Sequence, residues 1–364
     1  MVMKVLYDNS IFFKQSYGGI SKYFFKLFNN FDYQKDINFF VSSFIHKNEY
    51  LNEYSSESIY LKKYPLFSKT FFEQMNKFKF KKDHYVYKPD IIHYTYYGPQ
   101  ISTQSKSIVT VYDLIHEKFY KKYGLKKPFF EHRKKILDSM DIIISISENT
   151  KKDLIKIYKI NENKIHTVYL GLDIKKNITN DEINYTNNNP YILYVGNRSK
   201  HKNFISVIKA FSSSKKINSN FKFICFGGGE FNISEKKLFN DLNLNKKIEY
   251  IHGNDLLLQN LYKKSNLFVY STLYEGFGLP PMEAIQNNCP ALISNVGSLK
   301  EIYDDGVMYV NNPLDINEWS ENMKTILFED RIKNDYLTKG KKRIQLYSWQ
   351  KCADQTKNLY KKLL

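Results

Sequence analysis

STLYEGFGLPPMEA, at residues 271–284, is the most informative segment of this chain. It follows the apolar run LFVY at 267–270, which is short and β-prone enough to predict a buried strand, and its two prolines at 280–281 suit the first turn of a helix. A strand, a glycine loop and a helix start are therefore expected in that order. Gly276 and Gly278 let the backbone approach a ligand closely, and the start of the helix offers N–H groups with a partial positive charge. This geometry suits an anion.

Two carboxylates, Glu275 and Glu283, lie at the two ends of this loop, eight residues apart. Carboxylates there accept hydrogen bonds from ligand hydroxyls while the backbone holds a phosphate, so the predicted ligand is a sugar nucleotide. A structural explanation also exists, because an acidic residue in the first turn of a helix gains roughly 0.3–1 kcal/mol from the helix dipole and glycines shape turns. A structural turn, however, has no need for two glycines, two prolines and two carboxylates within nine residues. The combination favours a binding site.

The composition is that of a globular chain, and 364 residues are enough for two domains of ordinary size. The three cysteines, Cys225, Cys289 and Cys352, are far apart and odd in number, so they predict neither a disulfide framework nor a thiolate metal site. A reducing cytoplasm fits this usage. Residues 1–20 contain no signal-peptide pattern, and no apolar run of about 18 residues is present. Neither secretion by that route nor a membrane span is expected.

The net charge of +18 is concentrated in the first half, where residues 1–180 carry 30 Lys and Arg against 18 Asp and Glu. Basic and aromatic residues are interleaved in two segments, at 61–88 and at 118–135. This pattern suits the surface of an anionic bilayer, where each cation contributes on the order of 1 kcal/mol, and it also suits nucleic acid. A solvated, lysine-rich surface fits equally well. Peripheral binding at the inner face of the membrane is therefore one hypothesis.

Short apolar runs alternate with helix-length polar segments in both halves of the chain, which predicts parallel α/β sheets. The runs lie at 2–7, 91–92, 107–112, 142–146, 191–195, 221–226, 248–251, 267–270 and 291–293. Between Gly171 and Asn189 the chain turns to Asn, Thr and Lys without apolar periodicity. We therefore predict two doubly wound domains, at 1–176 and 190–345. Residues 346–364 are expected to form a terminal helix, and its return to the first domain is one alternative.

Ligands in open α/β sheets bind at the carboxyl ends of the strands, so polar residues at those positions are candidates. A paired glycine before a predicted helix adds a second phosphate-sized site, although the dinucleotide fingerprint Gly-x-Gly-x-x-Gly is absent. The candidates of the first half are Gly18, Gly19, His93, Thr95, Tyr96, Asp113 and His116.

In the second half, the sequence GNRSKHKN at 196–203 follows a predicted strand. Arg198 and Lys202 are expected to project from the same edge of the sheet as the Glu275 loop, where their positive charges neutralise a departing diphosphate. Solvent-facing cations are the alternative in a chain with 55 Lys and Arg. The position at the strand end favours the functional interpretation.

Several motifs together resemble glycosyltransferase family 4, whose members are retaining enzymes with the GT-B fold. The motifs are VGNRSKHKNF at 195–204, FGGGE at 226–230, EGFGLPPMEA at 275–284, SNVGSLKEIYDDG at 294–306 and YSWQKCADQ at 347–355. In the first half, YGGISKYF at 17–24, DIIHYTYYG at 90–98 and VTVYDLIHEKF at 109–119 resemble members that build surface polysaccharides. The resemblance covers nearly the whole chain, and the Glu-x7-Glu stretch is its most specific part.

The resemblance implies an α/β fold of two Rossmann-like domains that face each other across a cleft, with an acceptor-binding first domain and a donor-binding second one. It implies that Glu283 holds the ribose, and that Glu275 meets the transferred sugar and the phosphate. It also implies that Arg198 and Lys202 stabilise the leaving diphosphate. The donor-binding residues that it implies are Gly18, Gly19, Gly196, Asn197, Gly276, Phe277, Gly278, Leu279 and Glu283. This chain has Asn197 where the family commonly has its arginine, which leaves the phosphate partner open.

On the acceptor side, binding by His93, Thr95 and Tyr96 and proton handling by His93, Asp113 or His116 are hypotheses. Relatives often have His-Asp where this chain has Tyr112 and Asp113. The chain contains no Asp-x-Asp, so a divalent metal site is not expected and no cofactor is predicted besides the substrate. Pre-placed donors are then expected to meet the charge of the leaving group, and removing one commonly costs ~10²–10³ in rate. The family implies retention of configuration.

The function predicted is hexose transfer from a nucleoside-diphosphate sugar to a glycan or lipid-linked glycan in polysaccharide biosynthesis. GDP-mannose is preferred as donor on the resemblance alone, and the acceptor, the linkage and the oligomeric state are not readable from the sequence. A sugar-nucleotide epimerase on the same fold is the nearest alternative. A glycoside hydrolase with Glu275 and Glu283 as its acid and base leaves Arg198 and Lys202 without a task. A nucleic-acid-binding protein is the third alternative, and no nucleic acid is expected as a partner of the transferase.

Overall fold

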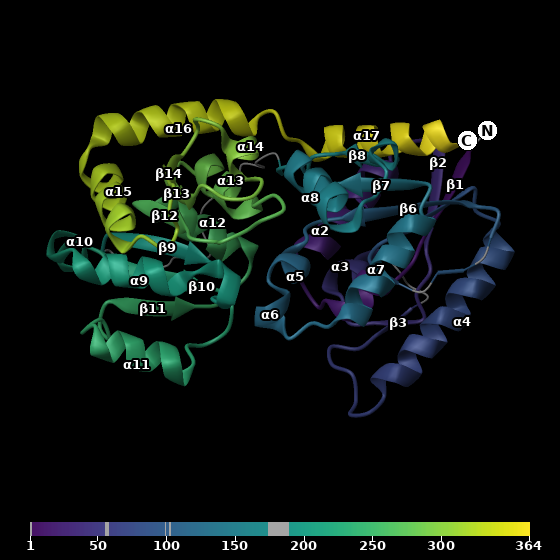
Figure 1. Cartoon of the computed structure of the whole chain (residues 1–364), viewed down its shortest axis with the longest axis horizontal. Helices are drawn as coiled ribbons and strands as arrows, with labels where there is room; N and C mark the ends of the chain where they lie inside the picture. Colours follow the sequence, from purple (N-terminus) through teal and green to yellow (C-terminus); the bar gives the residue numbers. More distant parts are fainter. Residues whose placement is uncertain (1, 55–57, 99, 102, 174–188) are drawn as a thin grey trace. The chain divides into compact units, whose positions relative to one another are not determined.

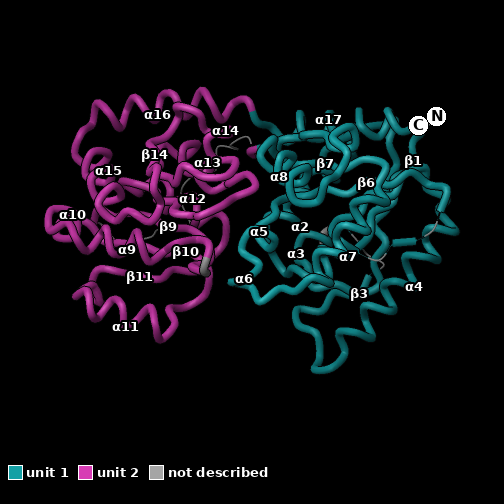
Figure 2. Tube along the Cα trace, in the orientation of Figure 1, with its two compact units in different colours: residues 1–171, 347–364 teal, residues 172–346 magenta. Residues whose placement is uncertain are grey.

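The computed structural model describes residues 2–54, 58–98, 100–101, 103–173 and 189–364 (Figure 1). The chain divides into two compact units, which are coloured separately in Figure 2. The first unit comprises residues 1–171 and 347–364, and the second comprises residues 172–346. Most of the linker expected between 176 and 190 lies outside the described residues.

The first unit is built on a parallel sheet with the strand order β2-β1-β5-β6-β7-β8, six strands in the part of the chain that is described. Its strands are β1 (Met3–Tyr7), β2 (Ile37–Val41), β5 (Ile91–Tyr94), β6 (Lys106–Val111), β7 (Ile142–Ser145) and β8 (Ile165–Thr167), with a separate pair β3 (Ile45–His46) and β4 (Ile59–Tyr60). The apolar runs predicted the four central strands. They missed β2 and β8, which are the edge strands and have fewer buried residues.

The helices of the first unit cover both faces of this sheet. They are α1 (Ser10–Lys14), α2 (Gly19–Phe31), α3 (Glu49–Tyr54), α4 (Lys69–Tyr87), α5 (Ile115–Lys118), α6 (Tyr120–Tyr123), α7 (Lys127–Ser139), α8 (Glu148–Tyr158) and α17 (Trp349–Leu363), with a 3-10 turn η1 (Glu162–Lys164). Helices α4, α7 and α8 bury their apolar side chains with Leu6, Ile92 and Val109 on one face. On the other face, α17 packs against α2. The terminal helix therefore belongs to the first unit (Figure 2).

The second unit repeats this architecture with the strand order β11-β10-β9-β12-β13-β14, again all parallel and six-stranded over the residues described. Its strands are β9 (Tyr191–Val195), β10 (Lys222–Phe226), β11 (Ile248–Ile251), β12 (Leu267–Tyr270), β13 (Ala291–Ser294) and β14 (Met308–Val310). The sequence predicted all of these except β14, a three-residue edge strand.

The helices of the second unit are α9 (Phe204–Ser213), α10 (Lys215–Asn220), α11 (Ile233–Asp241), α12 (Asp255–Lys264), α13 (Leu279–Gln286), α14 (Leu299–Tyr303), α15 (Ile316–Phe328) and α16 (Asp330–Ile344), with a 3-10 turn η2 (Lys200–Lys202). Helices α9 and α15 pack against each other over one face, where Val207, Trp319 and Met323 are fully buried against the strands. Helix α13 contacts β12 and β13. Each unit is thus a doubly wound α/β domain with a parallel sheet, which confirms the predicted fold class.

Both sheets contain a point at which the chain reverses its direction of strand addition. In the first unit this point lies between β1 and β5, and in the second between β9 and β12. Loops at the carboxyl ends of such neighbouring strands diverge, and ligands of open α/β sheets bind in the resulting crevice. Within the described ranges, none of the helices has both the length and the apolar character needed to cross a bilayer.

Candidate functional site

The loops after β9 and β12 meet at the reversal point of the second unit. Backbone and side-chain hydrogen bonds join them: the Leu273 N–H donates to the His201 carbonyl at 2.6 Å, and the Ser271 hydroxyl donates to the Lys202 carbonyl at 2.7 Å. The η2 turn is thereby fixed against the segment that opens the EGFGLPPMEA motif. This explains why a basic turn and an acidic loop that are 73 residues apart in sequence form one structure.

Lys202 and Glu275 form an ion pair at this junction. Their side chains are 18% and 12% exposed, so the pair is mostly shielded but still reachable from solvent. The Tyr270 hydroxyl lies 3.4 Å from the Lys202 Nζ. Burial, and then the Glu275 carboxylate, raise the pKa of Tyr270 well above its usual value, so its hydroxyl stays protonated. The predicted site residues Lys202 and Glu275 are therefore brought together.

A second loop, after β13, holds the backbone of Glu275. The Ser298 hydroxyl donates to the Glu275 carbonyl at 3.1 Å, and the Ser298 N–H donates to the same oxygen at 3.3 Å. Gly297 has a φ of 58°, and a Cβ at this position would lie 2.7 Å from the Glu275 carbonyl oxygen. Only glycine allows this close approach in this conformation. The motif SNVGSLKEIYDDG contains both residues, but its sequence alone did not indicate a role for Gly297 or Ser298.

Helix α13 begins directly after Gly278, whose φ is 86°. The expectation of several N–H donors at the helix start needs correction, because Pro280 and Pro281 carry no N–H and the Met282 N–H donates to the Tyr303 hydroxyl at 3.1 Å. Tyr303 also donates to the Gly278 carbonyl and so ties the loop to the helix. Backbone donors for an anion must therefore come from the buried loop before the helix and from its first residue.

Glu283 is half-buried and accepts a hydrogen bond from the Tyr262 hydroxyl at 3.4 Å. It is the fifth residue of α13 and not part of its first turn, which corrects the structural explanation that relied on the helix dipole. Tyr262 is fully buried on α12. The carboxylate is thus oriented by a neighbouring helix while remaining partly accessible.

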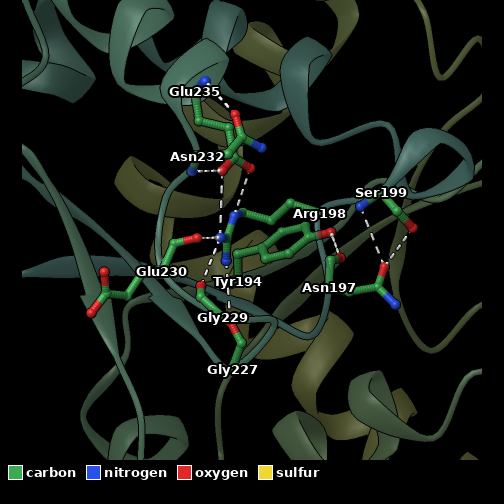
Figure 3. Close-up of polar contacts among 9 residues, drawn as sticks. All are labelled: Tyr194, Asn197, Arg198, Ser199, Gly227, Gly229, Glu230, Asn232 and Glu235. Carbon is green, nitrogen blue, oxygen red and sulfur yellow. Dashed lines mark hydrogen bonds and ion pairs between the residues drawn. The ribbon is translucent and has the colours of Figure 1, made fainter. Parts of the chain in front are cut away.

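Arg198 has a different environment from the one expected (Figure 3). Its Nε donates to Glu235 at 2.8 Å, and its other nitrogens donate to the carbonyls of three residues at 2.7–3.1 Å. Those residues are Gly227, Gly229 and Glu230. The side chain is only 4% exposed. This geometry contradicts the expectation that Arg198 neutralises a diphosphate, because its donors already hold the glycine loop after β10.

The partner of Arg198, Glu235, also closes the start of α11. Its carboxylate accepts from the Asn232 N–H at 2.8 Å, while the Asn232 side chain accepts from the Glu235 N–H at 2.9 Å, which is a capping box (Figure 3). One carboxylate thus fixes both a helix start and the guanidinium. Of the predicted neighbours of Arg198, Asn197 is exposed and Gly196 is half-buried with a φ of 111°.

The acceptor-binding candidates His93 and Thr95 are fully buried in the first unit. The ring nitrogens of His93 lie 2.6 Å from the Tyr360 hydroxyl and 2.8 Å from the Thr110 hydroxyl. Thr95 donates through its N–H and its hydroxyl to Asp8, at 2.5 and 2.8 Å. Both candidates were expected to bind the acceptor, and their burial and saturated hydrogen bonds contradict this. His93 instead connects β5 to α17.

The remaining candidates of the first unit are more accessible. Tyr96 is half-buried and accepts from Arg133 at 3.0 Å, and Asp113 is half-buried and accepts from the Ile115 N–H at 3.0 Å. His116 packs between the rings of Tyr123 and Phe129, with centroids 5.1 and 6.0 Å away. Burial, and then the Arg133 charge, lower the pKa of His116, so its imidazole is neutral at pH 7.

Gly18 and Gly19 lie at the start of α2 in the first unit. A Cβ on Gly18 would collide with the Gln15 side chain, whereas a Cβ on Gly19 would meet nothing within 4 Å. Gly19 is exposed. Its open surroundings are compatible with a ligand, and the role of both glycines toward the donor stays a prediction.

Two family descriptions match the chain. The one described as Glycosyltransferase Family 4 matches residues 17–176, and the one described as Glycosyl transferases group 1 matches residues 175–343. The two matches follow each other along the chain and coincide approximately with the two structural units.

The chain is also similar to individual glycosyltransferases in sequence and in structure. The chain is 30% identical over 225 residues to the O-antigen chain mannosyltransferase RfbU of Salmonella typhimurium, covering 60% of each chain. It is 24% identical over 249 residues to O-antigen chain mannosyltransferase B of Escherichia coli, covering 62% of each. The matches thus span about 60% of the length of these curated relatives. Sucrose-phosphate synthase of Thermosynechococcus elongatus has a similar structure, with a TM-score of 0.77, 20% identity, and coverage of 100% of this chain and 99% of that one.

The two doubly wound units have the GT-B fold. Within that fold class, the chain belongs to glycosyltransferase family 4.

Proposed function

We propose that the protein transfers a hexose, with retention of configuration, from a nucleoside-diphosphate sugar to a glycan or a lipid-linked glycan. The observation that carries this proposal is the Lys202–Glu275 pair at the reversal point of the second unit. In the free protein the two charges neutralise each other. When the donor binds, its diphosphate attracts the Lys202 ammonium, and Glu275 becomes available to accept hydrogen bonds from the hydroxyls of the transferred sugar.

The proposed chemistry depends on the negative charge that grows on the leaving diphosphate as the glycosidic bond breaks. Lys202 and the N–H groups around Phe277, Gly278 and Leu279, at the start of α13, are proposed to meet this charge. Glu283, held by Tyr262, is proposed to bind the ribose. Arg198 takes no direct part and acts as a positioning residue for the glycine loop.

The donor proposed is GDP-mannose, because the relatives RfbU and O-antigen chain mannosyltransferase B are named as mannosyltransferases. Their names also support an acceptor in the synthesis of a surface polysaccharide. On the acceptor side, His116 is the proposed proton acceptor because its imidazole is half-buried and neutral. His93 is excluded from this role by its burial.

The experiment is a transfer assay with GDP-, UDP- and dTDP-sugars and polysaccharide-derived acceptors, with product stereochemistry read by NMR. We expect an α-linked product from an α-linked donor, only when an acceptor is present. Product formation without an acceptor would indicate a sugar-nucleotide epimerase. Cleavage of glycans that is unaffected by free nucleoside diphosphate would indicate a hydrolase.

We further propose that the transferase works in the cytoplasm and binds the inner face of the membrane through α4 and the loop before it. Three aromatic residues spaced by seven, Phe71, Phe78 and Tyr85, are 62–79% exposed and share one side of this helix. Leu66 and Phe67 precede them and are almost fully exposed. Eight lysines against two carboxylates in residues 61–88 complement an anionic surface.

Co-sedimentation with vesicles of phosphatidylglycerol and phosphatidylcholine tests this membrane surface. The wild-type protein is expected to bind at low salt, and the triple change Phe71→Ser, Phe78→Ser and Tyr85→Ser is expected to abolish binding while donor turnover in solution persists. A matched control is Ile233→Ser, at an 86% exposed apolar residue of the second unit. Equal binding of the triple variant would contradict the assignment, and salt-sensitive binding to duplex DNA instead of vesicles would favour nucleic acid.

A further inference from the structure

One buried arginine of the first unit joins the loops that carry its accessible candidate residues. Arg133, on α7, is 5% exposed, and its Nη1 donates to the Glu117 carboxylate on α5 at 2.6 Å. Its Nη2 donates to the Tyr96 hydroxyl at 3.0 Å. Tyr96 follows β5 and Glu117 follows β6, and these two strands are neighbours in the sheet. The interleaved charge at 118–135 suggested a surface, but this member of the segment lies inside the fold.

Arg133 is coupled to His116 by two routes. The first is an aromatic ring, since the Arg133 Cζ lies 4.4 Å from the centroid of the Phe129 ring, and the His116 imidazole packs against the same ring with centroids 6.0 Å apart. The second is the ion pair, because Glu117 directly follows His116 in α5. The position of the imidazole therefore depends on where the guanidinium is held.

The Arg133–Glu117 pair is not required by stability alone. Glu117 is 5% exposed, and its Oε1 accepts from Arg133 and from the Tyr158 hydroxyl, each at 2.6 Å. Its Oε2 is buried and finds no hydrogen-bond partner among the described residues. Replacing a buried ion pair by apolar residues of similar volume is often neutral or stabilising. A role in fixing the position of α5 accounts for a pair with this incomplete set of hydrogen bonds.

The two groups next to Arg133 have the chemistry that an acceptor hydroxyl needs. A guanidinium carries only donors, so the Tyr96 hydroxyl that accepts from it directs its own proton elsewhere. Burial, and then the Arg133 charge, lower the pKa of His116, whereas Glu117 acts in the opposite direction. The imidazole is therefore neutral at pH 7 and can accept a proton. Both Tyr96 and His116 are half-buried.

We propose that Arg133 is a positioning residue for the acceptor side of the reaction, where its contacts with Glu117 and Tyr96 hold the His116 imidazole and the Tyr96 hydroxyl in place. The proposal rests on the proposed function, in which His116 accepts the proton of the acceptor hydroxyl. Arg133 acts only through these neighbours, because its own side chain is 6% exposed. The sequence motifs and the candidate residues drawn from them did not include it.

The charges around His116 allow a test with two opposite results. Among the described residues, the titratable and charged groups that face it are Glu117 on α5, Tyr123 on α6 and Arg133 on α7. Glu117→Gln keeps a hydrogen-bond acceptor but removes the negative charge, so the pKa of His116 should fall. The double change Arg133→Gln with Glu117→Gln removes both charges. Since Arg133 has the larger influence of the two, the pKa of His116 should then rise above its wild-type value.

NMR titration of the His116 imidazole in the full chain, assigned with His116→Gln, measures these shifts. The pH dependence of kcat/KM for the acceptor then shows whether the acid limb moves in the same directions. Arg133→Lys keeps the charge but loses the planar fork, so it should lower kcat/KM for the acceptor by ~10²-fold without moving the pH profile. Lys134→Gln, at the neighbouring exposed cation of α7, is the matched control and should change neither property.

Opposite shifts of the His116 pKa in the two charge variants, followed by the acid limb of the rate profile, support the proposal. An unchanged pKa in both variants overturns it, and so does a shift that the rate profile does not follow. Wild-type acceptor kinetics in a folded Arg133→Lys protein also overturn it. GDP and UDP affinity should be the same in all variants. Absence of hexose transfer by the folded wild type contradicts the proposed function instead, and the NMR titration still decides whether Arg133 controls His116.

Discussion

The two reversal points, one in each sheet, are built from the same topology but use their polar residues differently. In the second unit, Lys202 and Glu275 remain partly accessible and bond mainly to each other. In the first unit, His93 and Thr95 are fully enclosed, and their hydrogen bonds are satisfied by Tyr360, Thr110 and Asp8. The same strand-end position therefore yields a candidate catalytic pair in one sheet and an internal network in the other. Topology indicates where a ligand binds, and side-chain partners decide which residues are free to bind it.

The largest effect is expected from removing the Lys202–Glu275 pair in the second unit. Lys202→Ala and Glu275→Gln are each expected to lower kcat by ~10²–10³, because each removes a group that is placed before the reaction for the leaving diphosphate or the sugar. Steady-state kinetics with the preferred donor measures this. A change of less than threefold in both variants would show that the accessible pair is not part of the reaction.

The next largest expected effect is a loss of stability when Arg198 is replaced. Arg198→Met leaves the Glu235 carboxylate without its buried partner, which should lower the free energy of unfolding by about 3–5 kcal/mol in chemical denaturation. The double change Arg198→Met with Glu235→Leu should recover part of this loss. Lys324→Met, at an exposed ion pair with Glu321, is the control and should cost less than about 1 kcal/mol. A stable Arg198→Met protein with only donor binding impaired would restore the original expectation of a phosphate ligand.

The sequence predicted more of the second unit than of the first, for a physical reason. A glycine loop and a proline-started helix are local features, so EGFGLPPMEA defined its strand, loop and helix without tertiary information. Local sequence did not reveal that Arg198 would be captured by Glu235, because that contact depends on where α11 packs. A cavity of about 320 Å³ in the first unit, lined by Asp8, Glu73 and His132 among others, was missed for the same reason, since α1, α4 and α7 bring its wall residues together from distant segments. The edge strands β2, β8 and β14 were missed because their apolar runs are short or partly exposed.

The enclosed network of the first unit predicts a specific dependence of stability on pH. Burial lowers the pKa of His93 to about 3, so the folded state keeps this imidazole neutral while the unfolded state protonates it below about 6.5. The contribution of His93 to stability is therefore complete above pH 6.5 and is lost as the pH falls toward 3. At roughly 1.4 kcal/mol per pH unit, the loss of stability between pH 6.5 and pH 5 is about 2 kcal/mol.

Denaturation of wild type and His93→Gln at pH 7 and pH 5 measures this contribution. The variant should be less stable at pH 7, and its stability should fall less between the two pH values than that of the wild type. Identical slopes for the two proteins would mean that His93 is not held neutral by burial, and the contrast between the two reversal points would weaken.

Replacing single glycines by alanine is expected to have smaller effects. These effects should differ between Gly297, which has a structural role, and Gly19, which is predicted to face a ligand. Gly297→Ala should cost about 1–2 kcal/mol, because the new Cβ meets the Glu275 carbonyl at a positive φ, and it should also reduce activity by displacing Glu275. Gly19→Ala meets nothing within 4 Å and should leave the melting temperature unchanged while raising the donor KM. Thermal melts and donor titrations of both variants make the comparison. If Gly19→Ala changes neither property, the role of this glycine toward the donor is wrong.

Isothermal titration of GDP and UDP into the wild-type protein and into Lys202→Ala measures whether Lys202 binds the diphosphate, separately from the chemical step. We expect saturable binding of at least one nucleotide by the wild type, and binding at least tenfold weaker in the folded variant. Equal affinity in both proteins, or no nucleotide binding by a folded wild type, would contradict the assignment of the β9–β12 junction as the donor site.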